Sequence, residues 1–231
     1  MILGITIMAD PGLYRLLAWL SPSYPVGAFA YSHGLECAVE EGHIRDRATV
    51  TAWIDDVLRY GGGWSDAVLF TNTYEAADDI DALKELNDMA LSLAPSEERF
   101  LETTAQGTAF LKTTCDAWAC DLVRTVSAEL QRDIAYPIAV AVAAAGHNID
   151  KTMALHAFLH GVAANLVSAG VRLIPLGQTD GQRALAALEG SINDVAQDAM
   201  DAPISDVGGI AMLSDIAAMK HETQYTRLFR S

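Results

Sequence analysis

The chain has 231 residues and a formal net charge of −15 at pH 7. This acidity argues against binding to nucleic acid or to an anionic membrane surface, because both attract Lys and Arg. An acidic surface suits a basic protein partner or cations, or simply keeps a protein in solution. A chain of this length buries enough surface to fold without a metal or disulfide staple.

The three cysteines, Cys37, Cys115 and Cys120, have no C-x-x-C spacing. They predict neither a disulfide framework nor a zinc clamp, but buried, reduced thiols in the cytoplasm. The apolar start MILGITIM lacks a basic region and is too short to span a bilayer. We therefore expect no membrane segment. Residues 1–10 are candidates for disorder, and translation can start at Met1 or at Met8.

Apolar residues recur at helical spacing along the chain, and no useful run has the period of two that marks a strand. Helices are expected near residues 13–20, 31–41, 49–60, 64–77, 79–93, 97–126 (as one helix or two), 137–146, 150–174, 182–189 and 191–200. The sequence thus predicts an all-α fold, with residues 1–231 in a single helical-bundle-like domain of about nine or ten helices.

Two of these segments carry further signals. The 150–174 segment is apolar almost all round, which is typical of a central, buried helix. The Thr179-x-x-Gln182 spacing is that of a capping box and favours a helix start at Thr179.

Two pairs of metal-binding residue types occur at helical spacing, but neither forms a complete site. His156 and His160 are four apart, as in a zincin, yet Ala157 stands where that motif places its general base. A metal-dependent hydrolase using these two histidines is the alternative function, and core histidines are the simpler interpretation. His33 and Cys37 supply two ligands, too few for a closed site. The Gly61-Gly62-Gly63 run belongs to no Walker motif, so it predicts a helix-ending linker.

Polar residues within apolar stretches are the remaining candidates for function: Glu36, Asn165, Arg172, Gln178 and Gln182. A buried charge needs a partner, and an ion pair between Glu36 and Arg172 would satisfy both. Structural hydrogen bonding and a polar contact surface are both consistent with this pattern.

The C-terminal tail, residues 219–231 (MKHETQYTRLFRS), carries three basic residues against one acidic residue in an otherwise acidic chain. Tyr225, Leu228 and Phe229 lie at i, i+3 and i+4, which predicts an apolar stripe. The tail either folds back onto its own acidic body or orders against a partner. We expect His221 to be exposed enough to touch a metal or that partner.

Three long stretches of the sequence resemble the UreF family of urease accessory proteins. They are SPSYPVGAFAYSHGLE (residues 21–36), VRLIPLGQTDGQ (171–182) and KHETQYTRLFRS (220–231). The resemblance runs from about Leu13 to Ser231 and is looser between Ala76 and Cys120. It implies an all-α homodimer that catalyses no reaction and needs no cofactor. It also implies a nickel-delivery complex with the GTPase UreG, with UreD (also called UreH) and with the urease apoenzyme.

The resemblance also implies roles for particular residues. The tail corresponds to the family's UreD-docking segment, here Lys220, His221, Glu222, Gln224, Tyr225, Arg227, Leu228, Phe229 and Arg230. Glu36 and Arg172 correspond to positions implicated in coupling to UreG, with Gln178 and Gln182 beside them. Some family members have Lys at the position of Arg172, which keeps the charge but changes the donor geometry.

Overall fold

The computed structural model describes residues 10–130 and 133–231, and these residues fold into helices without a strand. The all-α prediction is confirmed. The expectations for residues 1–9 lie outside the described residues, whereas Asp10 is described and caps α1.

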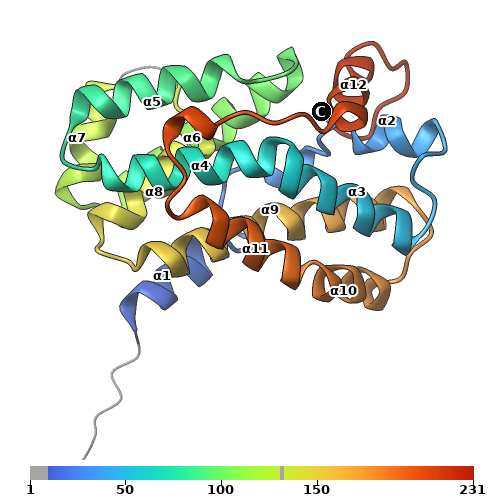
Figure 1. The fold of residues 1–231 in the computed structure, drawn as a ribbon, viewed down its shortest axis with the longest axis horizontal. Helices are drawn as coiled ribbons and strands as arrows, with labels where there is room; N and C mark the ends of the chain where they lie inside the picture. The colour runs from blue at the N-terminus through green and yellow to red at the C-terminus, as the bar shows by residue number, and fades with distance from the viewer. Residues whose placement is uncertain (1–9, 131–132) are drawn as a thin grey trace, which may run out of the picture.

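The first half of the chain contains six α-helices and a short 3-10 turn, and the second half contains the rest (Figure 1). Their bounds are α1 Pro11–Trp19, η1 Ala28–Ala30, α2 Leu35–Glu40, α3 Arg47–Tyr60, α4 Gly62–Glu75, α5 Ile80–Ser92, α6 Glu97–Ala117, α7 Asp121–Glu129, α8 Tyr136–Gly146, α9 Lys151–Leu173, α10 Gln178–Ala187, α11 Glu189–Ala199, η2 Ile204–Asp206 and α12 Met212–His221.

Side-chain caps fix several helix starts. Asp10, Asp79 and Asp150 each accept a hydrogen bond from a backbone N–H in the first turn of α1, α5 and α9. Such caps satisfy donors that the helix itself leaves unpaired. The capping box expected at Thr179 is wrong, because α10 begins at Gln178 and its N-cap, Gly177, has no side chain to offer.

Helix α2 begins later than expected, at Leu35, because the two residues before it adopt the left-handed conformation. His33 has a φ of 58° and Gly34 a φ of 73°. A Cβ on Gly34 would lie 2.4 Å from the backbone nitrogen of Ala218, so only glycine allows α12 to approach this closely. The turn therefore positions α12 against α2.

The core is centred on α8, whose residues from Pro137 to Ala144 are all buried. Helices α4, α6 and α9 surround it. The expectation that α9 is buried all round is only partly right, since its buried residues alternate with exposed ones such as His160 and Ser168. Among the described residues, α9 is the one helix long and apolar enough to cross a membrane, and half of that stretch is buried in the fold.

The chain after α11 crosses the face of α4 to reach α12 at the other end of the molecule (Figure 1). Side chains of α4 hold this crossing segment: Trp64 Nε1 donates to the Asp206 carbonyl (2.9 Å) and Asn72 Nδ2 to the Ala202 carbonyl (3.1 Å). Helices α2 and α12 pack together there, beside the last residue of the sequence.

Candidate functional site

The C-terminal tail lies on its own protein body, in a seat formed by acidic and polar side chains. The seat comprises Ser32, in the loop before α2, Glu36, on the first turn of α2, and Glu98 and Glu102, on successive turns of α6. All four side chains are buried. Glu102 forms a 2.5 Å ion pair with Arg99, and His33 Nδ1 lies 3.1 Å from its other oxygen. Of the two readings of the tail, the structure shows the one in which it folds back.

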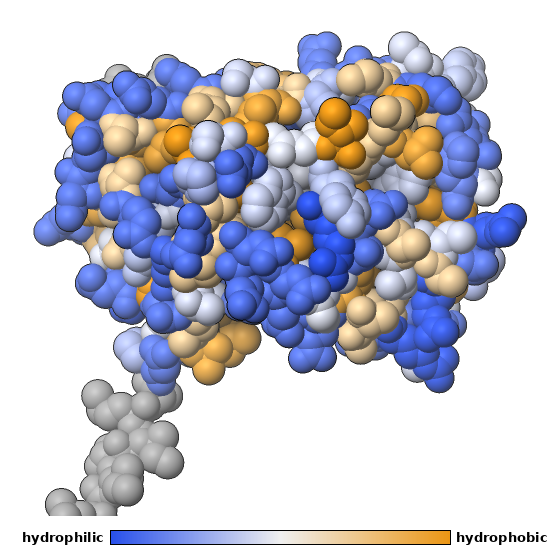
Figure 2. Space-filling view, in the orientation of Figure 1, coloured by the Kyte–Doolittle hydropathy of each residue, from blue (hydrophilic) through white to orange (hydrophobic). Residues whose placement is uncertain are grey.

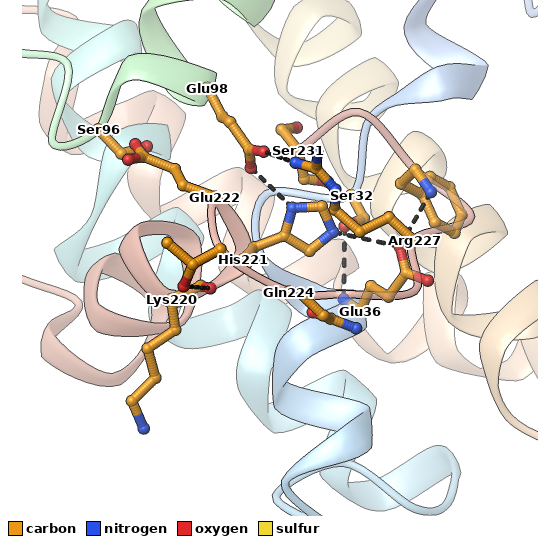
Figure 3. Close-up of polar contacts among 12 residues, drawn as sticks. Ser32, Glu36, Ser96, Glu98, Lys220, His221, Glu222, Gln224, Arg227 and Ser231 are labelled. Carbon is orange, nitrogen blue, oxygen red and sulfur yellow. Dashed lines mark hydrogen bonds and ion pairs between the residues drawn. The ribbon is translucent and has the colours of Figure 1, made fainter.

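His221 joins the two helices of the seat. Its Nδ1 lies 2.7 Å from Glu98 and its Nε2 lies 3.2 Å from Glu36 (Figure 3). Each ring nitrogen therefore lies within hydrogen-bonding distance of one carboxylate. Arg227 forms an ion pair with Glu98, at 2.6 Å. The His221 side chain has no exposed surface, so the expectation of an exposed His221 is wrong.

Glu36 receives the tail backbone. Its two oxygens accept hydrogen bonds from the N–H groups of Leu228 (2.7 Å) and Phe229 (2.9 Å). A carboxylate is a strong acceptor, and it also satisfies two backbone donors that no regular element pairs. Phe229 itself is buried, whereas Tyr225 is fully exposed and Leu228 is 65% exposed. The predicted apolar stripe is therefore not a helix face, because α12 ends at His221 and residues after it form turns.

Arg172 contacts the same phenylalanine from α9. Its guanidinium carbon lies 4.2 Å from the centroid of the Phe229 ring and 3.6 Å from that of Phe29. Such cation–π contacts suit the planar arginine head. The expected ion pair between Glu36 and Arg172 is not formed, because each of the two residues holds the tail instead.

The last residues of the chain pair with the loop before α2. Arg230 N donates to the Ala30 carbonyl (2.8 Å), and Ser32 N donates to the Ser231 carbonyl (2.8 Å). The Ser32 hydroxyl donates to the same carbonyl, and the Ser231 hydroxyl donates to Glu102 (2.7 Å). These contacts fix the end of the tail at several points.

A small polar cavity of about 100 Å³ lies beside the seat, lined among others by His33, Asp66, Arg99 and Asp215. Burial raises the pKa of Asp66 to about 7, although Arg99 opposes this shift. Burial also raises the pKa of Asp215 and lowers that of His33. For Glu102, burial alone would raise the pKa, but the charge of Arg99 and the interactions with His33 and Ser231 together outweigh burial and leave the pKa well below its usual range.

The other predicted residues lie apart from the seat. Gln178 and Gln182 are exposed on the first turns of α10, and Asn165 is partly buried on α9. Lys220 pairs with Glu41 at 2.6 Å, Glu222 accepts from the Glu97 N–H, and Gln224 donates to Glu40. In Figure 3 the Lys220 side chain points away from His221.

The paired histidines of α9 lie partly or fully at the surface. His156 Nδ1 lies 2.8 Å from the Thr152 carbonyl, and His160 is exposed. No group of three His, Cys, Asp or Glu side chains suited to a metal ion occurs within residues 10–130 and 133–231. His33 contacts Glu102 and not Cys37.

Sequence reasoning missed Ser32, Glu98, Glu102 and Phe29. A signal exists for the two glutamates: they lie four residues apart, on the α6 face that also carries buried Gln106 and Phe110. Acidic residues in register with a buried face predict buried carboxylates. Their partners in the tail lie more than a hundred residues away in the sequence and cannot be read from that spacing.

The sequence of this chain is similar to that of known proteins along most of its length. The model of the UreF family matches residues 44–189. The urease accessory protein UreF of Rhodopseudomonas palustris strain HaA2 is 49% identical over 222 residues, which is 95% of this chain and 93% of that protein. UreF of Bradyrhizobium sp. strain BTAi1 is 46% identical over 230 residues, or 99% and 95% of the two chains.

The chain belongs to the UreF family. The resemblance seen in the sequence is therefore confirmed, and the chain is a urease accessory protein. The family model stops before the tail, but the matches to UreF of both organisms extend over at least 95% of this chain.

Proposed function

We propose that this UreF-family chain is a non-enzymatic scaffold that bridges the GTPase UreG to UreD (UreH) and to the urease apoenzyme, so that nickel is inserted into the urease active site. Family membership supports the accessory role. The chain contains no Walker motif for a nucleotide. It acts as a homodimer in the cytoplasm, and nickel is its cargo.

The tail is the surface that docks on UreD. The observation that carries this proposal is the way the seat presents the tail: buried groups hold its backbone, while Tyr225 and Leu228 project into solvent. Nearby, α12 exposes Met212, Leu213 and Met219. Figure 2 shows hydrophobic side chains at the end of the molecule where Figure 1 places α12. Exposed apolar groups gathered in this way are typical of a protein interface.

The exposed residues Gln178 and Gln182 contact UreG, and Glu36 and Arg172, which hold the tail, take part in the coupling to UreG. Such contacts change GTP hydrolysis only if they favour one state of UreG over another, since a ligand shifts an equilibrium by its difference in affinity. Replacing both glutamines with Ala should weaken the complex with UreG and reduce urease activation, while leaving UreD binding unchanged.

Deleting residues 219–231 is a blunt test, because it also removes buried His221 and Phe229. The sharper variant is Tyr225→Asp with Leu228→Asp, which changes only exposed side chains. We expect binding to UreD to weaken at least tenfold, roughly 1.4 kcal/mol or more, with the melting temperature unchanged. Leu101→Asp, at an exposed leucine of α6, is the control. Undiminished binding of the double variant would refute tail docking.

Light scattering of the isolated protein measures its mass in solution and so tests whether it is a dimer.

A further inference from the structure

Glu36 and Arg172 meet the tail at one point, although they come from different helices. Glu36 of α2 binds the backbone N–H groups of Leu228 and Phe229, and Arg172 of α9 lies against the Phe229 ring. Adjacent side chains are thereby sent in opposite directions: Phe229 is 4% exposed and Leu228 is 65% exposed. Because no helix or strand pairs this stretch, its backbone conformation depends on these side chains.

The two contacts differ in chemistry, and the loss of either one would destabilise this conformation of the tail. Glu36 is 8% exposed and has three donors in reach, including His221. Removing one of its oxygens would leave a buried N–H without an acceptor. Arg172 has one nitrogen, Nη2, that is buried without a hydrogen-bond partner, so the two aromatic rings are the main neighbours of its head.

We infer that Glu36 and Arg172 are positioning residues for the docking surface: together they fix residues 228–229 so that Leu228 faces the partner. The inference rests on the proposed docking of the tail on UreD. It assigns both residues to the presentation of the tail, whatever else they touch. The contact also links the docking surface of the tail to a second exposed position, Phe29. Phe29 stacks on Arg172 and is itself 67% exposed. A protein that moves Phe29 or Arg172 would change the affinity of the tail for its partner, and the reverse holds by linkage.

Glu36→Gln is the first test, since it keeps the shape of the side chain and replaces one acceptor oxygen with a donor. The matched control is Glu40→Gln, which makes the same chemical change on the same helix. Glu40 also accepts a hydrogen bond from the tail, through Gln224, but at the surface. Amide hydrogen exchange in the full-length protein should become at least tenfold faster at Leu228 and Phe229 in Glu36→Gln. It should stay unchanged in Glu40→Gln.

Arg172→Lys is the second test, and it covers the outcome in which Glu36→Gln fails to fold. Lysine keeps the charge but lacks the planar head that lies on the rings. We expect Arg172→Lys to speed exchange at Phe229 less than Arg172→Gln does, with the far-ultraviolet circular dichroism of both unchanged.

Binding of the same variants to purified UreD decides the inference, with Tyr225→Asp/Leu228→Asp measured beside them. The positioning role is supported if the double variant binds at least tenfold more weakly, if Glu36→Gln or Arg172→Gln does so too, and if Glu40→Gln binds normally. If the double variant loses binding but Glu36→Gln and Arg172→Gln bind as the wild type or more tightly, the inference is wrong and tail docking stands. If the double variant binds normally, docking itself is wrong, and the positioning role falls with it.

Discussion

Helix α8 and the seat of the C-terminal tail are both buried, but by opposite chemistry. From Ile138 to Ala144, every side chain of α8 is apolar and has no exposed surface. The seat instead buries carboxylates, an imidazole and hydroxyls that come from α2, α6 and the tail. Apolar packing depends mainly on volume and tolerates exchange of similar side chains, whereas a buried polar network requires every partner in place. We therefore expect the core to set the stability of the fold and the seat to set the position of the tail.

The largest effect should follow a cavity in the core. Phe158 is 1% exposed, and its ring lies 5.5 Å from that of Phe70 and 5.6 Å from that of Tyr136. Phe158→Ala should lower the free energy of unfolding by about 3–5 kcal/mol, because buried surface is lost and the cavity collapses only in part. Urea unfolding followed by circular dichroism measures this change. A loss below about 1 kcal/mol would show that the core repacks freely there.

Two glycines allow the cost of a left-handed backbone to be distinguished from the cost of close packing between α2 and α12. Gly27 and Gly34 have nearly the same φ, +74° and +73°. Nothing lies within 4 Å of a Cβ built on Gly27, whereas a Cβ on Gly34 would meet α12 at 2.4 Å. Gly27→Ala should cost about 1 kcal/mol, the usual cost of a left-handed alanine. Gly34→Ala should cost roughly 2–4 kcal/mol, because it also forces α12 away.

Amide exchange of the same two variants locates the effect. In Gly34→Ala, exchange should quicken within α12 and the tail more than in α8. Equal losses of stability in the two variants would mean that α12 adjusts without cost, and the seat would then be less demanding than its contacts indicate.

The two regions also differ in how well the sequence predicts them. The core helices follow from apolar spacing and from local caps such as Asp79 and Asp150, which act within one turn. The seat depends on pairs such as His221 with Glu98, which are far apart in the sequence. Residue types there indicate that buried charges need partners, but not which partners. Hence the contacts that Glu36 and Arg172 make with the tail could not be predicted, and the ion pair expected between the two residues is not formed.

Asp66 gives a smaller effect, and a pH dependence, at the cavity beside the seat. Its pKa rises from 3.8 in the unfolded chain to about 7 in the fold. The folded protein thus binds the proton more tightly, and Asp66 makes stability fall as pH rises from about 4 to about 7. The lowered pKa of His33 acts in the opposite direction, so a comparison with Asp66→Asn is needed to isolate Asp66. Arg99, Glu102 and Asp215 surround the same cavity or act on Asp66 through their charge.

We expect the wild type to lose roughly 1–2 kcal/mol more than Asp66→Asn between about pH 5 and about pH 7.5. This is less than the full shift would give, because Asp66 is only partly buried and water screens its charge. Urea unfolding of both proteins at the two pH values provides the measurement. Parallel curves for the two proteins would contradict a raised pKa at Asp66.

The smallest effect should come from the paired histidines of α9, and it separates the scaffold from the hydrolase that the same spacing first suggested. His160 is exposed, and half-buried His156 has its Nδ1 2.8 Å from the carbonyl of Thr152, one turn before it. Replacing both with Ala should change the free energy of unfolding by less than about 0.5 kcal/mol, as is usual for surface positions. Neither the wild type nor the variant should retain zinc after dialysis, as measured by inductively coupled plasma mass spectrometry. One tightly held zinc per chain that is lost in the double variant would instead favour a hydrolase, because metal ligands that bind so firmly stabilise the fold and would not behave as free surface residues.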